Sequence, residues 1–198
     1  MTKKVNSRKK QAEFTKNKIF ETATDLIEKK GYNQVTIREI CKKAGVAKGT
    51  FYHYFSAKED LIIETYKRID QYYDEIIEKG FSCDNTIQQI IEIVAHKAVY
   101  VQKCKIDKVK EVYKAQMEVG NNFFTSKDRS SYKILYNIIQ KAQANNEFIK
   151  TKTAAEITTF IWIIVRGIIY DWCVNNGSYD LETFLKKYIK DILQTFLK

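Results

Sequence analysis

Turn-forming residues are scarce in this chain. The 198-residue sequence has no proline and only seven glycines. These two residues supply most tight turns and bulges of β-rich proteins, so the composition is better suited to helices. Apolar residues also recur at helical spacing along most of the chain, which indicates about nine helices. We therefore predict an all-α fold, long enough for one or two domains with a sizeable core.

Disulfide frameworks, secretion signals and membrane spans are not expected either. The four cysteines, at positions 41, 83, 104 and 173, show no paired C-x-x-C spacing, which indicates reduced thiols in a cytosol. No apolar segment follows the basic N-terminus. The most hydrophobic stretch, residues 160–170, contains Arg166 and is too short and too charged to cross a bilayer. The sequence thus predicts a cytoplasmic protein with no membrane partner.

Patterns that carry enzymatic chemistry are missing as well. The sequence has no phosphate-cradling glycine loop, no nucleophile elbow and no metal-ligand cluster, and it has only two histidines, His53 and His96. We therefore expect no enzymatic activity, no cofactor and no metal site.

Positive charge is concentrated at the N-terminal end. The formal net charge is +10, and residues 1–60 hold 14 Lys and Arg against 7 Asp and Glu, whereas residues 61–198 hold 20 against 17. A basic end of this kind is typical of a surface that approaches phosphates. The first cations are either a solvated tail or a DNA-contacting arm. They are Lys3, Lys4, Arg8, Lys9 and Lys10.

The segment 36–55, TIREICKKAGVAKGTFYHYF, reads as two short helices joined by a tight turn. Thr36 and Glu39 have the spacing of a capping box, which begins a helix. Gly45 tolerates the left-handed conformation that ends one. Between them, one apolar stripe is formed by Ile37, Ile40, Cys41 and Ala44.

The chain restarts as a second short helix after Val46. Phe51 and Phe55 are four residues apart and face inward together, which leaves polar and aromatic side chains on the other sides. Ser56 and Glu59 repeat the capping-box spacing, so a third helix is expected to open at once. Two-turn helices are not stable alone. We expect them to pack on the preceding helix, whose apolar stripe is Ile19, Phe20, Ala23, Leu26 and Ile27.

Residues 13–73 resemble the DNA-binding domain of the tetracycline-repressor (TetR) family of bacterial transcription regulators. The matching features are the helix ending at Gly31-Tyr32, the threonine cap of the next helix, Ala44-Gly45-Val46 at the turn, KGTFYHYF at 48–55, and Lys58-Glu59-Asp60-Leu61. These motifs cover about a third of the chain. One departure is Cys41, where the family usually carries alanine; both residues are small, so the fold should not change.

The resemblance implies two domains. Residues 13–73 form a three-helix DNA-binding domain with its helix-turn-helix motif at 36–55, and residues 74–198 form a helical regulatory and dimerisation domain. It also implies function: a sequence-specific transcription regulator, a ligand-responsive repressor that binds a palindromic double-stranded DNA operator as a homodimer. Two recognition helices then enter major grooves about one helical turn apart.

DNA-contacting roles follow from side-chain chemistry. Cations, hydroxyls and the Gly49 N–H suit phosphates, whereas Thr50 and His53 suit base edges. Tyr52 and Tyr54 could also read bases. Thr36 can offer its N–H or hydroxyl to a phosphate at a helix N-terminus. The Tyr52 ring has an alternative role as support for the small domain's core. The full set of predicted DNA-contacting residues is Thr36, Lys48, Gly49, Thr50, Tyr52, His53, Tyr54 and Lys58.

In the resembled family the larger domain holds a small-molecule pocket, so we expect a small hydrophobic or aromatic effector here. Aromatic residues at helical spacing can equally pack in the hydrophobic core without touching a ligand. His96 and Arg166 can equally have their polar partners within the fold. The predicted ligand-lining residues are Tyr66, Tyr73, Tyr100, Met117, Phe124, Tyr136, Trp162, Arg166 and Tyr170.

Residues 160–165 are apolar on every side, and such a helix must be covered on every side. In the family, the last two helices of each subunit form a four-helix dimer interface; a central core helix in a monomer is the alternative. The predicted interface residues are Ile161, Ile164, Ile168, Phe184, Tyr188 and Ile192.

A second functional class stays open at this point. A helical interaction protein could bind acidic partners or a membrane surface through its basic N-terminal end. That class explains the charge, but not the successive capping boxes with a turn between them.

Overall fold

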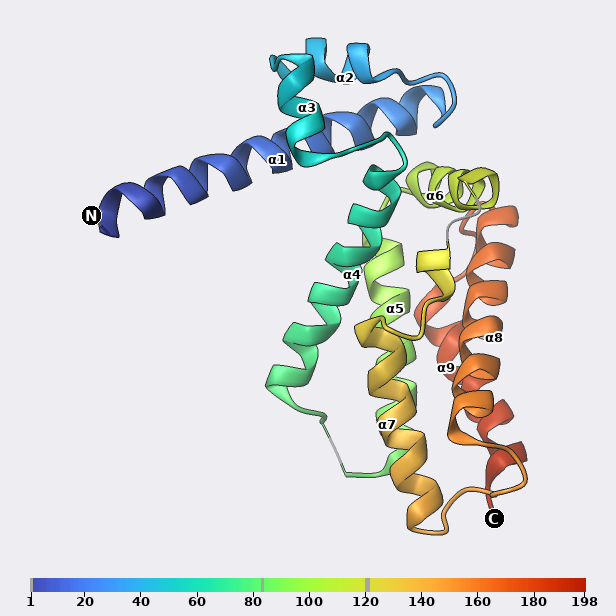
Figure 1. The fold of residues 1–198 in the computed structure, drawn as a ribbon. Coiled ribbons are helices and arrows are strands. Elements are labelled where there is room, and N and C mark those ends of the chain that lie inside the picture. Colours follow the sequence, from blue (N-terminus) through green and yellow to red (C-terminus); the bar gives the residue numbers. More distant parts are fainter. Residues whose placement is uncertain (1, 83, 120–121) are drawn as a thin grey trace. The chain divides into compact units, whose positions relative to one another are not determined.

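The structure is a computed structural model that describes residues 2–82, 84–119 and 122–198, with side chains for 8–82, 84–118 and 124–198. Within these ranges the chain forms nine α-helices and two short 3-10 helices, as expected for an all-α protein (Figure 1). The α-helices are α1 (Thr2–Lys30), α2 (Ile37–Ala44), α3 (Lys48–Tyr54), α4 (Asp60–Lys79), α5 (Thr86–Lys103), α6 (Ile106–Val119), α7 (Ser130–Ala144), α8 (Ala154–Val174) and α9 (Leu181–Leu193). The 3-10 helices are η1 (Asn122–Thr125) and η2 (Gln194–Phe196).

The chain divides into two compact units. The first, called unit 1, contains the chain up to Thr65 and the part of α6 that begins at Lys110. The second, unit 2, contains Tyr66–Val109 and the chain from Asn122 to Lys198. The units therefore differ from the expected ranges 13–73 and 74–198, because α4 and α6 each contribute to both.

Unit 1 is built on α1, which packs against α2, while α2 packs against α3. The apolar stripe expected for α1 is buried: Ile19, Phe20, Ala23, Leu26 and Ile27. An ion pair of 2.7 Å between Lys16 and Glu64 joins α1 to the start of α4. The Tyr32 N–H, just after α1, donates to Glu111 on α6 at 3.0 Å. These contacts give the two-turn helices the support that they lack alone.

Unit 2 is a helical bundle in which α5 packs against α7 and α9, and α8 packs against the same two helices (Figure 1). The end of the chain is fixed by backbone bonds: Ile149 N–H donates to the Phe196 carbonyl at 2.9 Å, and Lys198 N–H to that of Glu147 at 3.1 Å. The core consists mainly of isoleucine, valine, leucine and aromatic side chains from all four helices.

The structure corrects one local expectation and defines the caps of two further helices. The third helix of the motif begins at Asp60, because the Asp60 carboxylate accepts the Ser56 and Ala57 N–H groups and thereby stabilises a turn instead of a Ser56–Glu59 capping box. Helix α5 is capped by Asn85, whose side chain accepts the Gln88 N–H. Helix α8 has a complete capping box, formed by its cap Thr153 with Glu156.

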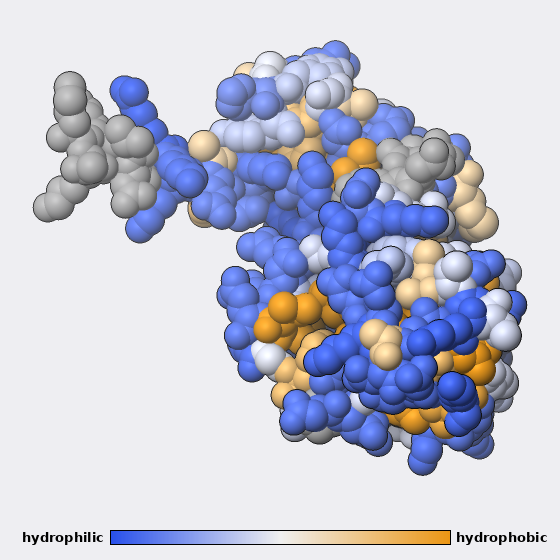
Figure 2. Space-filling view, turned by 60° about the horizontal axis from the view of Figure 1, so that its bottom comes forward, coloured by the Kyte–Doolittle hydropathy of each residue, from blue (hydrophilic) through white to orange (hydrophobic). Residues whose placement is uncertain are grey.

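The hydrophobic stretch 160–170 lies inside the longer helix α8. By length and composition its 21 residues could cross a bilayer, but half of its most apolar segment is buried inside the protein. The core helix of a soluble protein meets the same criterion. Unit 2 shows hydrophobic surface in separate patches bordered by hydrophilic residues (Figure 2).

Candidate nucleic-acid interface and effector region

The turn between α2 and α3 has a fixed backbone geometry. Gly45 ends α2 with φ +65°, in the left-handed region that glycine adopts readily. The next residue, Val46, donates its N–H to the Cys41 carbonyl at 3.0 Å, which closes the end of α2. The Cys41 side chain is buried, and burial raises the pKa of its thiol, with Lys48 partly opposing the shift. The thiol therefore stays neutral and acts as a small apolar group.

Helix α3 separates an inward from an outward face. Phe51 and Phe55 are almost fully buried, and their ring centroids lie 5.6 Å apart, so both hold the short helix in place. The outward face contains exposed residues, Lys48, Gly49, Tyr52 and His53, and partly exposed ones, Thr50 and Tyr54. All six are predicted DNA-contacting residues, and the fold places them together on one short helix.

Two features make the start of α3 accessible to a large ligand. A Cβ added to Gly49 would meet no atom within 4 Å, so the glycine is not required by packing within the chain. The Lys48 ammonium lies 5.7 Å from the centroid of the Tyr52 ring, which is 45% exposed. A bare backbone flanked by a cation and a hydroxyl suits close approach to phosphates.

Lys58 has a structural role that the sequence analysis did not predict. Its ammonium donates to the carbonyls of Tyr32 and Val35 at 2.9 and 3.2 Å. It also lies 4.1 Å from the centroid of the Tyr32 ring. With two of its three N–H donors bonded inside unit 1, Lys58 ties the loop after α1 to the turn before α4. Sequence spacing could not reveal this, because the three residues lie in separate segments.

Thr36 is exposed and caps α2, and its hydroxyl accepts the Glu39 N–H at 3.2 Å. The reciprocal half of the predicted capping box is absent among the described contacts, since the Glu39 carboxylate pairs with Lys30. Near the N-terminus, Arg8, Lys9 and Lys10 are exposed on α1. The side chains of Lys3 and Lys4 lie outside the described residues.

Residues 19–65 match the family described as "Bacterial regulatory proteins, tetR family". The matched range begins in α1 and contains the whole helix-turn-helix with its outward polar face. The chain belongs to the TetR family of bacterial transcription regulators. It is a DNA-binding transcription regulator, and the alternative of a general interaction protein for acidic partners or membranes is not favoured.

Two curated relatives and one solved structure illustrate the similarity. The fatty acid metabolism regulator protein of Bacillus subtilis is 34% identical over 79 residues, which cover 40% of this chain and 41% of that protein. The transcriptional repressor KstR2 of Rhodococcus jostii is 24% identical over 195 residues, covering 90% and 89%. The crystal structure of the regulator FadR from Bacillus subtilis in complex with stearoyl-CoA has a TM-score of 0.66 at 19% identity and covers 89% and 96%, which shows a shared fold.

The residues predicted to line an effector pocket fall into two groups in this TetR-family chain. Tyr66, Tyr73 and Trp162 are buried in unit 2, where Phe124 and Arg166 lie close to them. Tyr100 and Tyr136 are partly exposed.

Two of the ligand predictions need correction. Met117 is 69% exposed on the part of α6 that belongs to unit 1, and Tyr170 is 55% exposed on α8. Periodicity shows that these residues sit on apolar faces, but it does not show which face points inward.

The sequence interpretation missed the ionic part of this region. Arg129, at the start of α7, is buried and forms a bidentate ion pair with Asp70 of α4 at 3.1–3.2 Å. Its guanidinium also lies 5.0 Å from the centroid of the Tyr66 ring. Lys97 on α5 lies in the same charged neighbourhood. The only sequence signal for this cluster is that Asp70 shares a helix face with Tyr66 and Tyr73.

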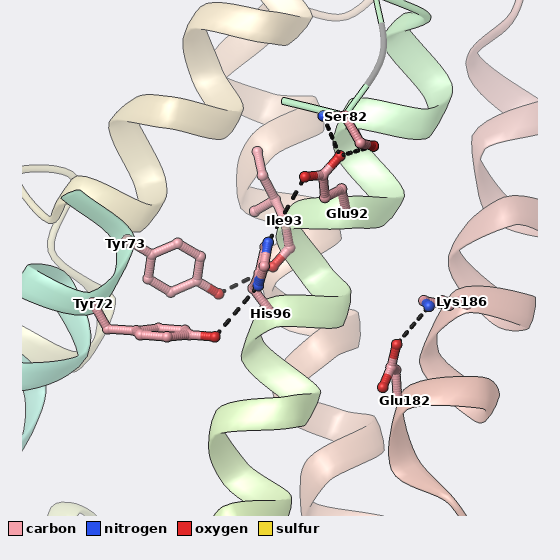
Figure 3. A network of polar contacts seen from close by, with 8 residues as sticks. All are labelled: Tyr72, Tyr73, Ser82, Glu92, Ile93, His96, Glu182 and Lys186. Carbon is pink, nitrogen blue, oxygen red and sulfur yellow. Dashed lines mark hydrogen bonds and ion pairs between the residues drawn. The ribbon is translucent and has the colours of Figure 1, made fainter. Parts of the chain in front are cut away.

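The His96 ring has polar partners within the fold, which is one of the two alternatives that the sequence left open. Its Nδ1 lies 3.3 Å from the Tyr72 hydroxyl, and its Nε2 lies 3.8 Å from the Glu92 carboxylate (Figure 3). The same Glu92 accepts from the N–H and hydroxyl of Ser82. Figure 3 shows that this network, with the Tyr73 hydroxyl donating to Ile93, joins α4 to α5.

The predicted dimer-interface residues on α8 require a correction. Ile161 and Ile168 point into unit 2 and are 0% and 9% exposed, so they face this chain's own core. Ile164 is partly exposed. The large apolar side chains that face solvent along α8 are instead Phe160, Ile163, Tyr170 and Val174, at 46–59% exposure. On α9, Tyr188 is 44% exposed, and Phe184 and Ile192 are partly exposed.

Proposed function

We propose that this protein is a ligand-responsive repressor that binds a palindromic operator as a homodimer, with one α3 helix in each of two major grooves. The observation that carries the proposal is the outward face of α3, on which six polar, aromatic or glycine residues lie together while Phe51 and Phe55 fix the helix from below. A rigid short helix with this face fits the major groove. Such a protein acts in the bacterial cytoplasm, where the DNA is.

Lys48, the Gly49 backbone and the tyrosine hydroxyls then hold phosphates, and Thr50 and His53 read base edges. Lys58 is left out of this set, since its ammonium is bonded to two carbonyls. The exposed cations Arg8, Lys9 and Lys10 on α1 add attraction to the duplex that does not depend on sequence.

The dimer is supported by the exposed stripe on α8. Phe160, Ile163, Gly167, Tyr170 and Val174 follow one another at alternating steps of three and four residues, the spacing of a helix–helix seam. A Cβ added to Gly167 would meet no atom within 4 Å, so a partner helix can approach closely there. A continuous apolar stripe of this kind is unusual on a monomer. The same stripe on a second copy, together with Tyr188 of α9, would cover it.

The effector proposed for unit 2 acts through helices that belong to both units. Because α4 and α6 each contribute to both, a ligand that favours one placement of these helices also changes the equilibrium between separations of the two α3 helices in the dimer. One relative of the same fold is described as bound to stearoyl-CoA. We accordingly expect a largely apolar effector.

The decisive experiment selects duplexes that bind the purified protein from a random pool and measures their affinity by fluorescence anisotropy against salt. We expect an inverted repeat. Lys48→Ala should weaken binding to specific and random duplexes alike and reduce the log–log salt slope by about one unit. Lys187→Ala on α9, also exposed, should change neither quantity. A protein that cannot distinguish the selected repeat from random DNA at moderate ionic strength contradicts the proposal.

A further inference from the structure

Unit 2 contains a cluster of charged and aromatic side chains contributed by five elements. On α4, Tyr66, Asp70 and Tyr73 share one helix face, and the Tyr66 ring lies 5.1 Å from that of Phe124 in η1. The Tyr73 ring is in edge contact with Trp162 of α8, with centroids 6.3 Å apart. One turn further along α8, the Arg166 guanidinium lies 5.5 Å from the Phe124 centroid.

Lys97 completes the cluster from α5. The Tyr73 hydroxyl donates to the carbonyl of Ile93, which is one helical turn before Lys97. The charged groups that act on the Lys97 ammonium are Arg129, Asp70 and Arg166, and the Cys104 thiol also interacts with it. Counting Lys97 itself, these groups are three cations and one carboxylate, besides the thiol.

The Asp70 carboxylate is already engaged. Both oxygens of Asp70 accept from Arg129 in the bidentate pair, whose side chains are only 13% and 8% exposed. In the part of the chain that the structure describes, no carboxylate lies within ion-pair distance of the Lys97 ammonium. The Lys97 ammonium, which has no carboxylate partner of its own, can therefore pair with an anion that enters the cluster.

A second donor in the same cluster also has no acceptor. Trp162 is 7% exposed, and its Nε1–H has no hydrogen-bond partner among the described residues. Buried indole N–H groups usually find an acceptor. An unpaired N–H and an uncompensated ammonium thus lie within one aromatic cluster.

We propose that the effector of this regulator carries an anionic head group, a carboxylate or a phosphate ester, which Lys97 and the Trp162 Nε1–H bind while the aromatic rings contact its apolar body. This inference rests on the proposed ligand-responsive function and extends it to the chemical class of the ligand. The Arg129–Asp70 pair holds the site in place, and Arg166 adds positive potential.

Protonation supports the same assignment. Burial, and next the charge of Arg129, lower the pKa of Lys97 to about 7, against an opposing effect of Asp70. The Lys97 side chain is partly exposed, so an anion can reach its ammonium from solvent. A bound anion favours the charged ammonium, so binding near pH 8 should be accompanied by uptake of up to about one proton.

The test uses four ten-carbon probes that differ only in the head group: decanoate, decyl phosphate, decanamide and decyltrimethylammonium. Isothermal titration at pH 8, in two buffers of different ionisation enthalpy, measures affinity and proton uptake. We expect at least one anion to bind about tenfold or more tightly than the amide, the magnitude of a charged hydrogen bond, and the cation to bind weakest. The tighter anion identifies the head group.

Lys97→Met should reduce the affinity for that anion to the level of the amide and abolish proton uptake, and the affinity for the amide should not change. Lys103→Met, an exposed lysine at the end of the same helix, is the matched control and should bind like the unmodified protein. Trp162→Phe keeps a ring but removes the donor, and should weaken the anion several-fold. It provides an independent readout should Lys97→Met fold poorly.

Equal binding of anions and amide, binding of none of the probes, or an unaltered preference in Lys97→Met would overturn the inference. These outcomes are separate from the DNA-binding result, because a protein that selects an inverted repeat but shows no anion preference retains its proposed function. Release of the selected duplex by the preferred anion, measured by anisotropy, would link the two sites.

Discussion

The two units use charge and apolar surface in opposite ways. In unit 1, the recognition helix α3 turns Lys48, Tyr52 and His53 outward and buries two phenylalanines. In unit 2, a bidentate ion pair lies inside, whereas α8 exposes a stripe of large apolar side chains. The first arrangement is what a soluble helix should show, and only the choice of side chains suggests DNA. The second is unusual, because charged groups are normally exposed and large apolar side chains are normally buried. A buried charge needs an opposite charge, and an exposed apolar stripe indicates a binding surface.

The difference also explains why the site of one unit can be predicted from the sequence more readily than that of the other. The outward side of α3 is specified within seven consecutive residues. The charged cluster of unit 2 joins Asp70, Lys97 and Arg129, which are far apart along the chain. Substitutions of single side chains in unit 1 and in unit 2 test this comparison.

The largest effect is expected at the exposed apolar stripe of α8. Ile163→Glu should place a charge in the proposed dimer interface and weaken self-association about a hundredfold or more, while the folded monomer is retained because the side chain is 54% exposed. Analytical ultracentrifugation measures the mass. Ile77→Glu, at 41% exposure on α4, is the control and should leave the mass unchanged. An unaltered dimer in Ile163→Glu would place the interface elsewhere.

The next effect concerns the buried ion pair. Asp70→Asn leaves Arg129 without its carboxylate in a neighbourhood that already contains Lys97, so the free energy of unfolding should fall by about 3–5 kcal/mol. Urea denaturation measures it. Asp74→Asn, exposed one turn further along α4, should change stability by no more than about 0.5 kcal/mol. Similar stabilities of the two variants would show that the pair is not a structural requirement.

A smaller effect appears in the pH dependence of stability. Because the pKa of Lys97 is lowered to about 7 in the folded protein, the unfolded chain binds more protons between that pH and the ordinary lysine pKa. This side chain therefore makes stability rise with pH in that window, by up to about 1.4 kcal/mol per pH unit. Lys97→Met should be more stable at neutral pH and should lack this slope. Parallel stability curves for the two proteins from pH 7 to 10 would contradict the assignment.

The smallest effect distinguishes packing from DNA contact in α3. Gly49→Ala has open space for its Cβ and replaces a poor helix former, so stability should rise by about 0.5–1 kcal/mol. Affinity for the selected duplex should nevertheless fall, since the added methyl group separates the backbone from a phosphate. Thermal unfolding and anisotropy measure the two quantities. A variant that gains stability and binds DNA as before would remove Gly49 from the interface.

Much of the fold and of the candidate site on α3 could be predicted from the sequence. The Thr36 cap, the left-handed Gly45 and the inward Phe51 and Phe55 are all observed. Lys58 shows the limit of such reasoning: it has the right chemistry for phosphate, but its ammonium binds two carbonyls from an earlier loop. Local spacing contains no information about that loop.

The sequence by itself determined the helices, their number and which face of α3 points outward. Capping, glycine conformation and 3.6-residue periodicity all depend on residues within a few helical turns along the chain. Only the tertiary structure decided which side of α8 points inward, so that Ile161 is buried while Ile163 is exposed, and which charges meet around Lys97. A helix that is apolar on all sides has no preferred orientation until its neighbours are in place. Likewise, the pKa of a lysine depends on groups that only folding brings within reach.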